Sequence, residues 1–137
     1  MEILPFSSDP SLKASFHSRH YDSSGWLEWY VIELEALDFQ AKTRVENPRY
    51  GHPPSQLFEE LAVSWKGWEG TKTWFAMEGE LELEATSDRI GHVTLTVAIP
   101  ASASERQWSA RVAVTIEAGQ LERLAAEAGA FFARRDA

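Results

Sequence analysis

Four glutamates at alternate positions are the first residues of this sequence whose type and spacing could do chemistry. They are Glu78, Glu80, Glu82 and Glu84. Alternate residues of a β-strand lie on one face, about 6.5–7 Å apart, a separation at which paired carboxylates act in glycoside hydrolysis. Nothing in the surrounding sequence would bury one of them and raise its pKa, and a flat strand does not make oxygen atoms converge on a cation. We therefore predict a solvated strand face rather than a catalytic or metal site.

Histidine spacing gives no metal or catalytic motif. The histidines are His17, His20, His52 and His92. His17 and His20 are three residues apart on a predicted strand, so they should point to opposite faces, and neither has the helical i, i+4 spacing of a zinc-binding pair. His92 follows a predicted turn, where we expect it to bond to Asp88 or to a turn carbonyl. Because no serine lies in a G-x-S-x-G motif and the glycines form no phosphate loop, we expect no enzyme, no cofactor and no metal.

Composition and charge narrow the class of protein. The chain has 137 residues, enough for a single domain over 1–137 with its own core, and we expect residues 1–10 to be a loose lead-in. Lys and Arg number 13 against 21 Asp and Glu, a net charge of −8. This balance argues against nucleic acid and permits a basic protein partner, but we favour the plainer interpretation that many cytoplasmic proteins are acidic. The sequence leaves the oligomeric state open.

The absence of cysteine and of long apolar runs bears on location. Without cysteine the chain forms no disulfide and no thiolate zinc site, as is common in a reducing cytoplasm. The first residues contain neither a basic region nor an apolar run of signal-peptide length, and no segment approaches the ~20 apolar residues of a membrane span. We therefore expect a cytoplasmic protein that does not bind membranes.

Alternating apolar residues predict three strands before the first helix. They begin near Leu12 and cover about 28–36 and 39–46. If a two-residue turn joins the last two, Glu33 lies opposite Lys42 and both faces of the hairpin match under one register. A single long bent strand is the alternative.

Apolar residues at a spacing of 3.6 predict two helices. One begins near Pro54 or Ser55, since proline suits a first helical position and serine suits a cap, and it stops by Gly67. Its apolar stripe is Leu57, Phe58, Leu61 and Trp65. The other covers about 118–135 and is expected to dock on the sheet.

A tryptophan-rich stretch over residues 65–74 joins the first helix to the next strand. Stacked indoles on a surface would bind carbohydrate or another small molecule. The residues that would do so are Trp65, Trp68 and Trp74. The competing interpretation, which we favour, is that they seal the junction of helix and sheet, because tryptophans are mostly buried.

The clearest strand pattern lies in a hairpin over residues 74–99. Its predicted inner face carries Phe75, Met77, Leu81 and Leu83, and its outer face the four glutamates. With a turn over 87–91 we pair Ala85 with Val93, and a third strand follows over 108–116. This register predicts an outer row of Glu82, Thr96 and Arg111.

These elements predict an α+β fold of order β-β-β-α-β-β-β-α. We expect an antiparallel sheet of about six strands, with both helices packed on one face and the other face open to water, because two helices cannot cover both faces. The alternative is two three-stranded sheets packed face to face, with the helices at an edge.

The open sheet face is the predicted place of partner binding. It combines charges, which set register and on-rate, with an aromatic anchor, which supplies binding energy. The residues that we expect to contact a partner are Trp29, Glu33, Glu35, Glu80, Glu82, Glu84 and Arg111. A plain solvated face is the competing interpretation.

Several short segments of the chain resemble a known family. They are Glu78-Gly-Glu-Leu-Glu-Leu, Asp88-Arg-Ile-Gly-His92, Glu117-Ala-Gly-Gln-Leu-Glu122, and Trp65-Lys-Gly-Trp68 with Trp74. Together they are similar to a family of small uncharacterised bacterial proteins, over about residues 12–133. The acidic strand, the D-x-x-G-H turn and the apolar strand are also similar to immunity proteins, which neutralise bacterial toxins.

This resemblance implies a cytoplasmic bacterial domain that binds and masks a toxin, and it brings no catalytic residues with it. We therefore expect a non-enzymatic protein-binding domain, with an immunity-type inhibitor of a basic toxin as its specific form. The alternative is a small-molecule or carbohydrate-binding domain that uses residues 65–74.

Overall fold

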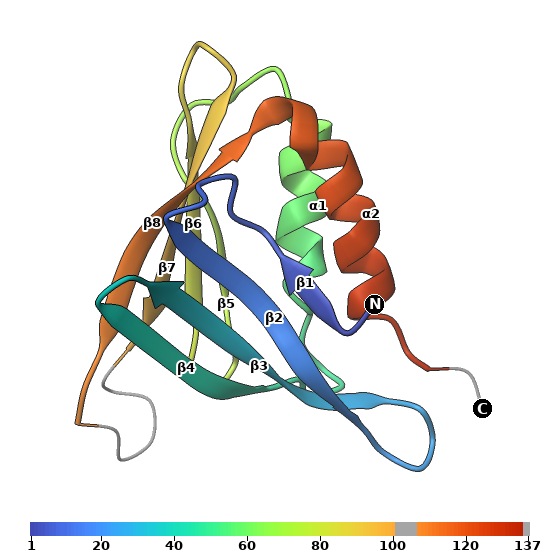
Figure 1. Cartoon of the computed structure of the whole chain (residues 1–137). Coiled ribbons are helices and arrows are strands. Elements are labelled where there is room, and N and C mark those ends of the chain that lie inside the picture. The colour runs from blue at the N-terminus through green and yellow to red at the C-terminus, as the bar shows by residue number, and fades with distance from the viewer. Residues whose placement is uncertain (101–106, 136–137) are drawn as a thin grey trace.

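The computed structural model describes residues 1–100 and 107–135, which form two four-stranded antiparallel sheets and two helices that contact each other (Figure 1). Sheet A consists, in spatial order, of β1 (Ile3–Pro5), β2 (Leu12–Tyr21), β3 (Leu27–Ala36) and β4 (Phe39–Glu46). Sheet B consists, in the same manner, of β5 (Lys72–Phe75), β6 (Glu82–Ser87), β7 (His92–Ile99) and β8 (Ala110–Glu117). The helices are α1 (Ser55–Val63), the short 3₁₀ helix η1 (Ala118–Gln120) and α2 (Leu121–Phe131).

The predicted α+β class is confirmed, but the single sheet of about six strands is wrong. The sequence pattern did not indicate β1, and it merged β5 and β6, which a turn separates. Helix α1 separates β4 from β5 in the chain, and β5 does not pair with β4 but begins a second sheet. The predicted alternative of two sheets is nearer to the structure, which has four strands in each rather than three.

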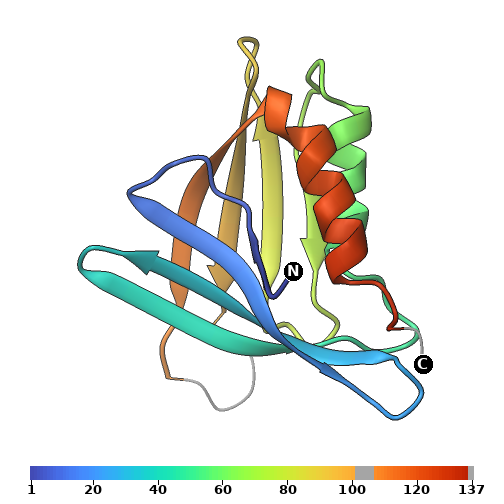
Figure 2. The ribbon, with the colours of Figure 1, turned by 45° about the vertical axis from the view of Figure 1, so that its right-hand side comes forward.

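The two halves of the chain have the same order, four strands and then a helix. Helix α1 follows sheet A but contacts β5, the first strand of sheet B, and α2 follows sheet B but contacts β1. Figure 2 shows the helices side by side, with the strands of both sheets next to them. This reciprocal packing holds the two halves of the chain together.

One apolar core lies between the sheets and the helices, and aromatic rings from both halves meet in it. The ring centroids of Phe6 and Phe16 are 5.0 Å apart, those of Phe16 and Phe132 are 5.1 Å apart, and those of Tyr30 and Phe132 are 5.0 Å apart. All four side chains are buried. Burying one large apolar side chain stabilises a protein by about 1.5–3 kcal/mol, so this cluster is a main source of stability.

The β3–β4 hairpin has the predicted register. Glu33 pairs with Lys42, and Ala36 pairs with Phe39 across a two-residue turn. The apolar side chains of β3, including Leu34, therefore point into the core together. This confirms two strands rather than one long bent strand.

Residues 1–10 are more ordered than the loose lead-in that we expected. Ile3–Pro5 form the edge strand β1, in which Leu4 pairs with Phe16 of β2. Leu4 and Phe6 are buried, so burial in the core orders this segment. Pro5 is tolerated because an edge strand does not need every backbone donor.

The strand that we predicted across Phe75, Met77 and Leu83 is broken by a tight turn. Gly79 has a φ of 77°, a conformation that glycine adopts readily, and its N–H donates to the carbonyl of Ala76 at 3.0 Å. The chain reverses here and β6 returns beside β5. Phe75 and Met77 are consequently exposed, and their predicted inward orientation is wrong.

The predicted ladder of four glutamates is broken by the same turn. Only Glu82 and Glu84 lie on β6, whereas Glu78 and Glu80 belong to the connection between β5 and β6. Strand alternation therefore does not continue through all four carboxylates.

The register of β6 against β7 differs from the prediction by two residues. Val93 pairs with Ser87, whereas we had paired it with Ala85. The carboxylate of Asp88 closes a tighter turn because it accepts the backbone N–H of His92 at 2.9 Å. The Nδ1 atom of His92 also lies 3.1 Å from Asp88 Oδ2, which confirms the predicted contact between the two residues.

The C-terminal residues dock on the turn between β2 and β3. The N–H of Arg135 donates to the carbonyl of Gly25 at 2.8 Å, and the guanidinium of Arg134 donates to the carbonyl of Ser24 at 2.8 Å. Gly25 has a φ of +88°, and a Cβ atom there would lie 2.0 Å from the carbonyl oxygen of Arg135. Only glycine therefore fits at this contact.

Candidate functional site

A groove of about 740 Å³ lies along β2 on the outer face of sheet A. Figure 1 shows sheet A in front, with both helices beside it and neither across this face. The apolar part of the lining includes Ile3, Pro5 and Leu12. The charged part is Glu2, Asp9, Glu33 and Glu35 with Lys13. We call this concavity the β2 groove.

The short edge strand β1 shapes the β2 groove. β1 pairs only with residues 15–17 of β2, whereas β2 extends from Leu12 to Tyr21. Ile3 and Pro5 point outward, opposite to the buried Leu4, and supply apolar surface at the edge of the sheet. The alternation of a three-residue strand therefore places apolar side chains on the open face.

Glu33 and His17 form a fixed polar pair in the groove. Glu33 Oε1 lies 2.7 Å from His17 Nε2, and Glu33 Oε2 accepts a hydrogen bond from Gln40 at 2.6 Å. The side chains of His17 and Glu33 are 21% and 19% exposed. The hydrogen bonds from Gln40 and then His17 lower the pKa of Glu33 from its ordinary value. Glu33 therefore carries its charge at neutral pH in a set orientation.

Ser18 extends this pair into a chain of three groups. Its Oγ lies 2.7 Å from His17 Nδ1, and its φ of 55° makes it the one non-glycine residue with positive φ in the described part of the chain. The register of β2 against β3 shifts between His17 and His20, so Ser18 lies in a β-bulge. The bulge brings both histidines to the outer face, so their predicted opposite orientation is wrong. Hydroxyl, imidazole and carboxylate in this order also occur in serine hydrolases. The side chain of Ser18 is exposed, however, and the order of three groups does not by itself make it a nucleophile.

Glu2 and Glu35 are the free carboxylates of the β2 groove. Neither has a hydrogen bond or ion pair with another residue of the described ranges. Asp9, in contrast, accepts hydrogen bonds from the backbone and the hydroxyl of Ser11. Lys13 lies opposite Glu35 in the register of β2 and β3. The groove thus keeps acidic groups that a partner could bind without breaking an internal contact.

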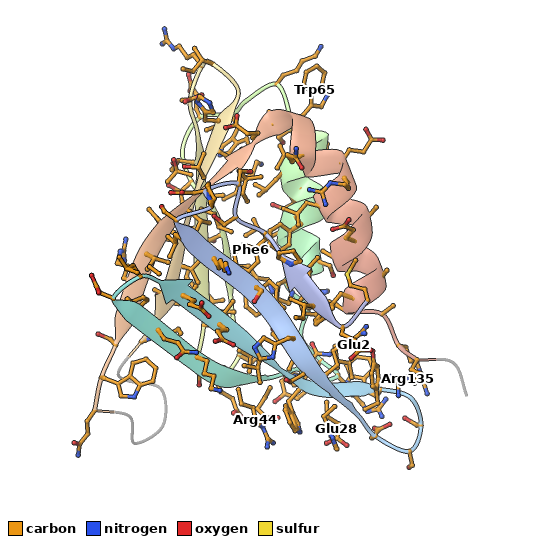
Figure 3. The ribbon with its side chains drawn as sticks, viewed as in Figure 1. Glu2, Phe6, Glu28, Arg44, Trp65 and Arg135 are labelled. Carbon is orange, nitrogen blue, oxygen red and sulfur yellow. The ribbon has the colours of Figure 1, made fainter. Side chains whose placement is uncertain are left out.

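Trp29, the predicted aromatic anchor, lies on the same outer face but outside the groove lining. The ring of His20 stacks on it with 5.0 Å between centroids, and the guanidinium of Arg44 lies 4.4 Å from its centroid. These two residues come from β2 and β4, on either side of β3. The guanidinium of Arg44, which Figure 3 labels, lies 2.8 Å from the carboxylate of Glu46. Trp29 is therefore stacked within the protein.

The remaining predicted contact residues do not join this face. Glu82 and Arg111 share an outer row of sheet B across Ala98, and Glu84 lies in the next row with Thr96. Our predicted row of Glu82, Thr96 and Arg111 is therefore wrong.

Glu80 is buried rather than exposed, and its Oε2 accepts the backbone N–H of Glu46 at 3.1 Å. It links the turn after β5 to the edge of β4, so it cannot contact a partner in this structure. The predicted set accordingly divides into three residues on sheet A, three on sheet B and one inside.

The three tryptophans of the predicted ligand site have different environments. Trp74 is buried, and its Nε1 donates to the carbonyl of His52 at 2.9 Å. Trp68 packs partly buried against the core. Trp65 is 57% exposed, because α1 ends at Val63 and does not continue the predicted stripe. The structure does not bring the three indoles into one exposed row.

Sequence patterns did not indicate three groove residues, Glu2, Ile3 and Ser18. The buried Leu4 and Phe6 alternate with Ile3 and Pro5, and this alternation could have indicated β1. A strand of three residues is, however, too short to give a clear pattern. No residue type signals the left-handed backbone at Ser18, since a serine rarely adopts it.

Among the described residues no group of three or more His, Asp or Glu could hold a metal ion. No helix in the same ranges is long and apolar enough to cross a membrane.

The fold and the groove define a two-sheet α+β protein with an acidic, partly apolar open face. The chain belongs to a family of unknown function, DUF6228, whose sequence model matches residues 6–135. No curated protein and no solved structure matches it. The expected membership of an uncharacterised family is thus confirmed, whereas the similarity to immunity proteins gains no support from these comparisons.

Proposed function

We propose that this chain is a non-enzymatic protein-binding domain that binds a basic partner through the outer face of sheet A. The observation that carries the proposal is the β2 groove, where exposed apolar side chains lie among four carboxylates and one lysine. Apolar contact supplies affinity, and opposite charge supplies orientation and on-rate. The net charge of −8 adds a long-range attraction for a cationic partner.

An immunity-type inhibitor of a bacterial toxin is the specific form of this function that we propose. Its support is the likeness of the hairpin over residues 74–99 to immunity proteins, together with the acidic charge. An inhibitor of this type acts in the cytoplasm by covering a basic surface of the toxin, so it needs no catalytic groups.

The free carboxylates allow a test with a matched control. Tagged full-length protein would be used to capture proteins from a lysate of the source bacterium, as wild type and as two double variants. Glu2→Lys/Glu35→Lys reverses charge in the groove, and Glu82→Lys/Glu84→Lys makes the same change of net charge on sheet B. We expect the first variant to lose a partner that the second keeps. Capture of no specific protein, or equal loss in both variants, would contradict the proposal.

The alternative of a small-molecule or carbohydrate-binding domain over residues 65–74 has less support. It relies on Trp65 alone, since Trp74 is buried and Trp68 packs against the core. A glycan array would test it with Trp65→Ala as the control, and binding that this change abolishes would favour it.

A further inference from the structure

We propose that the β2 groove seats an extended segment of the partner, with apolar side chains at its centre and basic side chains at both ends. This inference rests on the proposed protein-binding function and specifies what the groove recognises.

The length of the groove suits an extended peptide. It follows β2 from Lys13 to Ser18, and five steps of about 3.3 Å per residue give roughly 17 Å. An extended segment of about five or six residues has that length.

The apolar surface lies at the middle of this length. Ile3 is the Cα partner of His17, and Pro5 is the partner of Ser15, so both lie beside the central part of the groove. Ile3 is 55% exposed although it is a large apolar residue. Covering such a side chain with apolar groups of a partner is favourable, so the centre of the bound segment should be apolar.

Acidic groups lie toward both ends. Glu2 precedes Ile3 at the end of the groove near Ser18, and Figure 3 labels it at the start of β1. Glu35 and Asp9 lie toward the opposite end, where Lys13 is the one opposing cation among the lining residues. Glu2 and Glu35 have no partner within the described chain. Lysine or arginine at each end of the segment would therefore meet an unpaired carboxylate.

The polar pair between these ends does not compete for the segment. His17 has both ring nitrogens within 2.7 Å of a partner, one at Ser18 and one at Glu33. An acidic segment would find no free cation except Lys13 and would face the remaining carboxylates. The groove therefore selects against negative charge as well as for positive charge.

Three blocked seven-residue peptides test the proposal with the full chain. The first has lysine at both ends around valine and isoleucine, the second has glutamate in place of lysine, and the third has serine in place of the apolar residues. Fluorescence anisotropy should show binding of the first peptide, with the other two at least about tenfold weaker, or about 1.4 kcal/mol. Glu2→Lys/Glu35→Lys should weaken binding of the first peptide by a similar factor. Glu82→Lys/Glu84→Lys should weaken the same binding by less than about twofold.

Amide chemical shifts report both the place of binding and the integrity of the variants. Shifts should change at residues 2–5, 13–18 and 33–35, and not across sheet B. Equal binding of all three peptides, no binding of the first, or equal effects of both double variants would overturn the inference. If the capture experiment still finds a partner that depends on Glu2 and Glu35, the proposed function stands and only the occupant of the groove is wrong. If the peptide binds as expected but no partner is captured, the proposed function fails instead.

Discussion

Glu33 connects the polar groups at the centre of the β2 groove, since it accepts from Gln40 and lies 2.7 Å from His17. These contacts favour its ionised form and hold its pKa below the ordinary value of 4.5. A carboxylate with a lowered pKa stabilises the fold above its ordinary pKa, and this stability is lost as the pH falls through the lowered value.

Glu33→Gln should therefore lower the free energy of unfolding at pH 7 by about 1 kcal/mol, a modest value because water reaches the pair. The difference from wild type should shrink when both are measured near pH 3. Urea denaturation at the two pH values measures it, with Glu82→Gln, which removes no internal contact, as the control. An equal loss at both pH values would show that the ionised carboxylate is not the cause.

The reactivity of Ser18 is a test of whether the groove has catalytic activity. Its Oγ lies 2.7 Å from His17 Nδ1, and its side chain is exposed, so a reactive Ser18 would be open to a soluble probe. A fluorophosphonate probe should leave the full chain unlabelled, as judged by intact mass. Labelling that disappears in Ser18→Ala would contradict a non-enzymatic function.

At the scale of the elements, the C-terminal residues dock on the turn between β2 and β3. Gly25→Ala adds a Cβ atom 2.0 Å from the carbonyl oxygen of Arg135, and it also disfavours a φ of +88°. We expect a loss of about 2–3 kcal/mol in urea denaturation, from backbone strain and from displacement of the tail.

Gly79→Ala provides the matched control for Gly25→Ala. Gly79 has a φ of +77° with no atom near the added Cβ, so this variant should show only the backbone cost of about 1 kcal/mol. Removing residues 134–137 should bring the cost of Gly25→Ala down to that of Gly79→Ala. If truncation changes nothing, the tail does not dock at Gly25 as described.

The hairpins show which part of the fold the sequence could predict. A two-residue turn between Ala36 and Phe39 leaves β3 and β4 one register that matches both faces, and the prediction was right. The β6–β7 hairpin has a longer turn, and a shift by two residues keeps every side chain on the same face. Alternation could not distinguish pairing Val93 with Ala85 from pairing it with Ser87, and the backbone contacts of Asp88 decide between them.

The site was harder to predict than the strands. Glu33, Glu35 and Trp29 lie on the predicted open face because alternation fixes the face of a strand. The β2 groove depends on the short strand β1 and on the bulge at Ser18, which arise from packing against the core and leave little pattern in the sequence.

For the molecule as a whole, three buried side-chain polar atoms lack a hydrogen-bond partner in the described chain: Tyr30 Oη, Trp68 Nε1 and Glu80 Oε1. The hydroxyl of Tyr30 is fully buried and has no hydrogen-bond partner in the described chain. Burial and the nearby charge of Glu80 raise its pKa well above the ordinary value, so it stays neutral.

Tyr30→Phe should leave the free energy of unfolding unchanged or raise it by about 1 kcal/mol, because it removes an unpaired buried hydroxyl and keeps the ring. Thermal and urea denaturation measure this, and Tyr50→Phe at an exposed position should have no effect. A loss above about 1 kcal/mol would mean that a bound water pairs the hydroxyl.

Binding of a basic protein to the outer face of sheet A is the interaction that we propose. Its most direct test is the dissociation constant of the captured partner, measured by calorimetry for wild type, Glu2→Lys/Glu35→Lys and Glu82→Lys/Glu84→Lys. We expect binding at least about tenfold weaker for the first variant and within about twofold of wild type for the second. Equal weakening by both variants, or unchanged binding by the first, would contradict it.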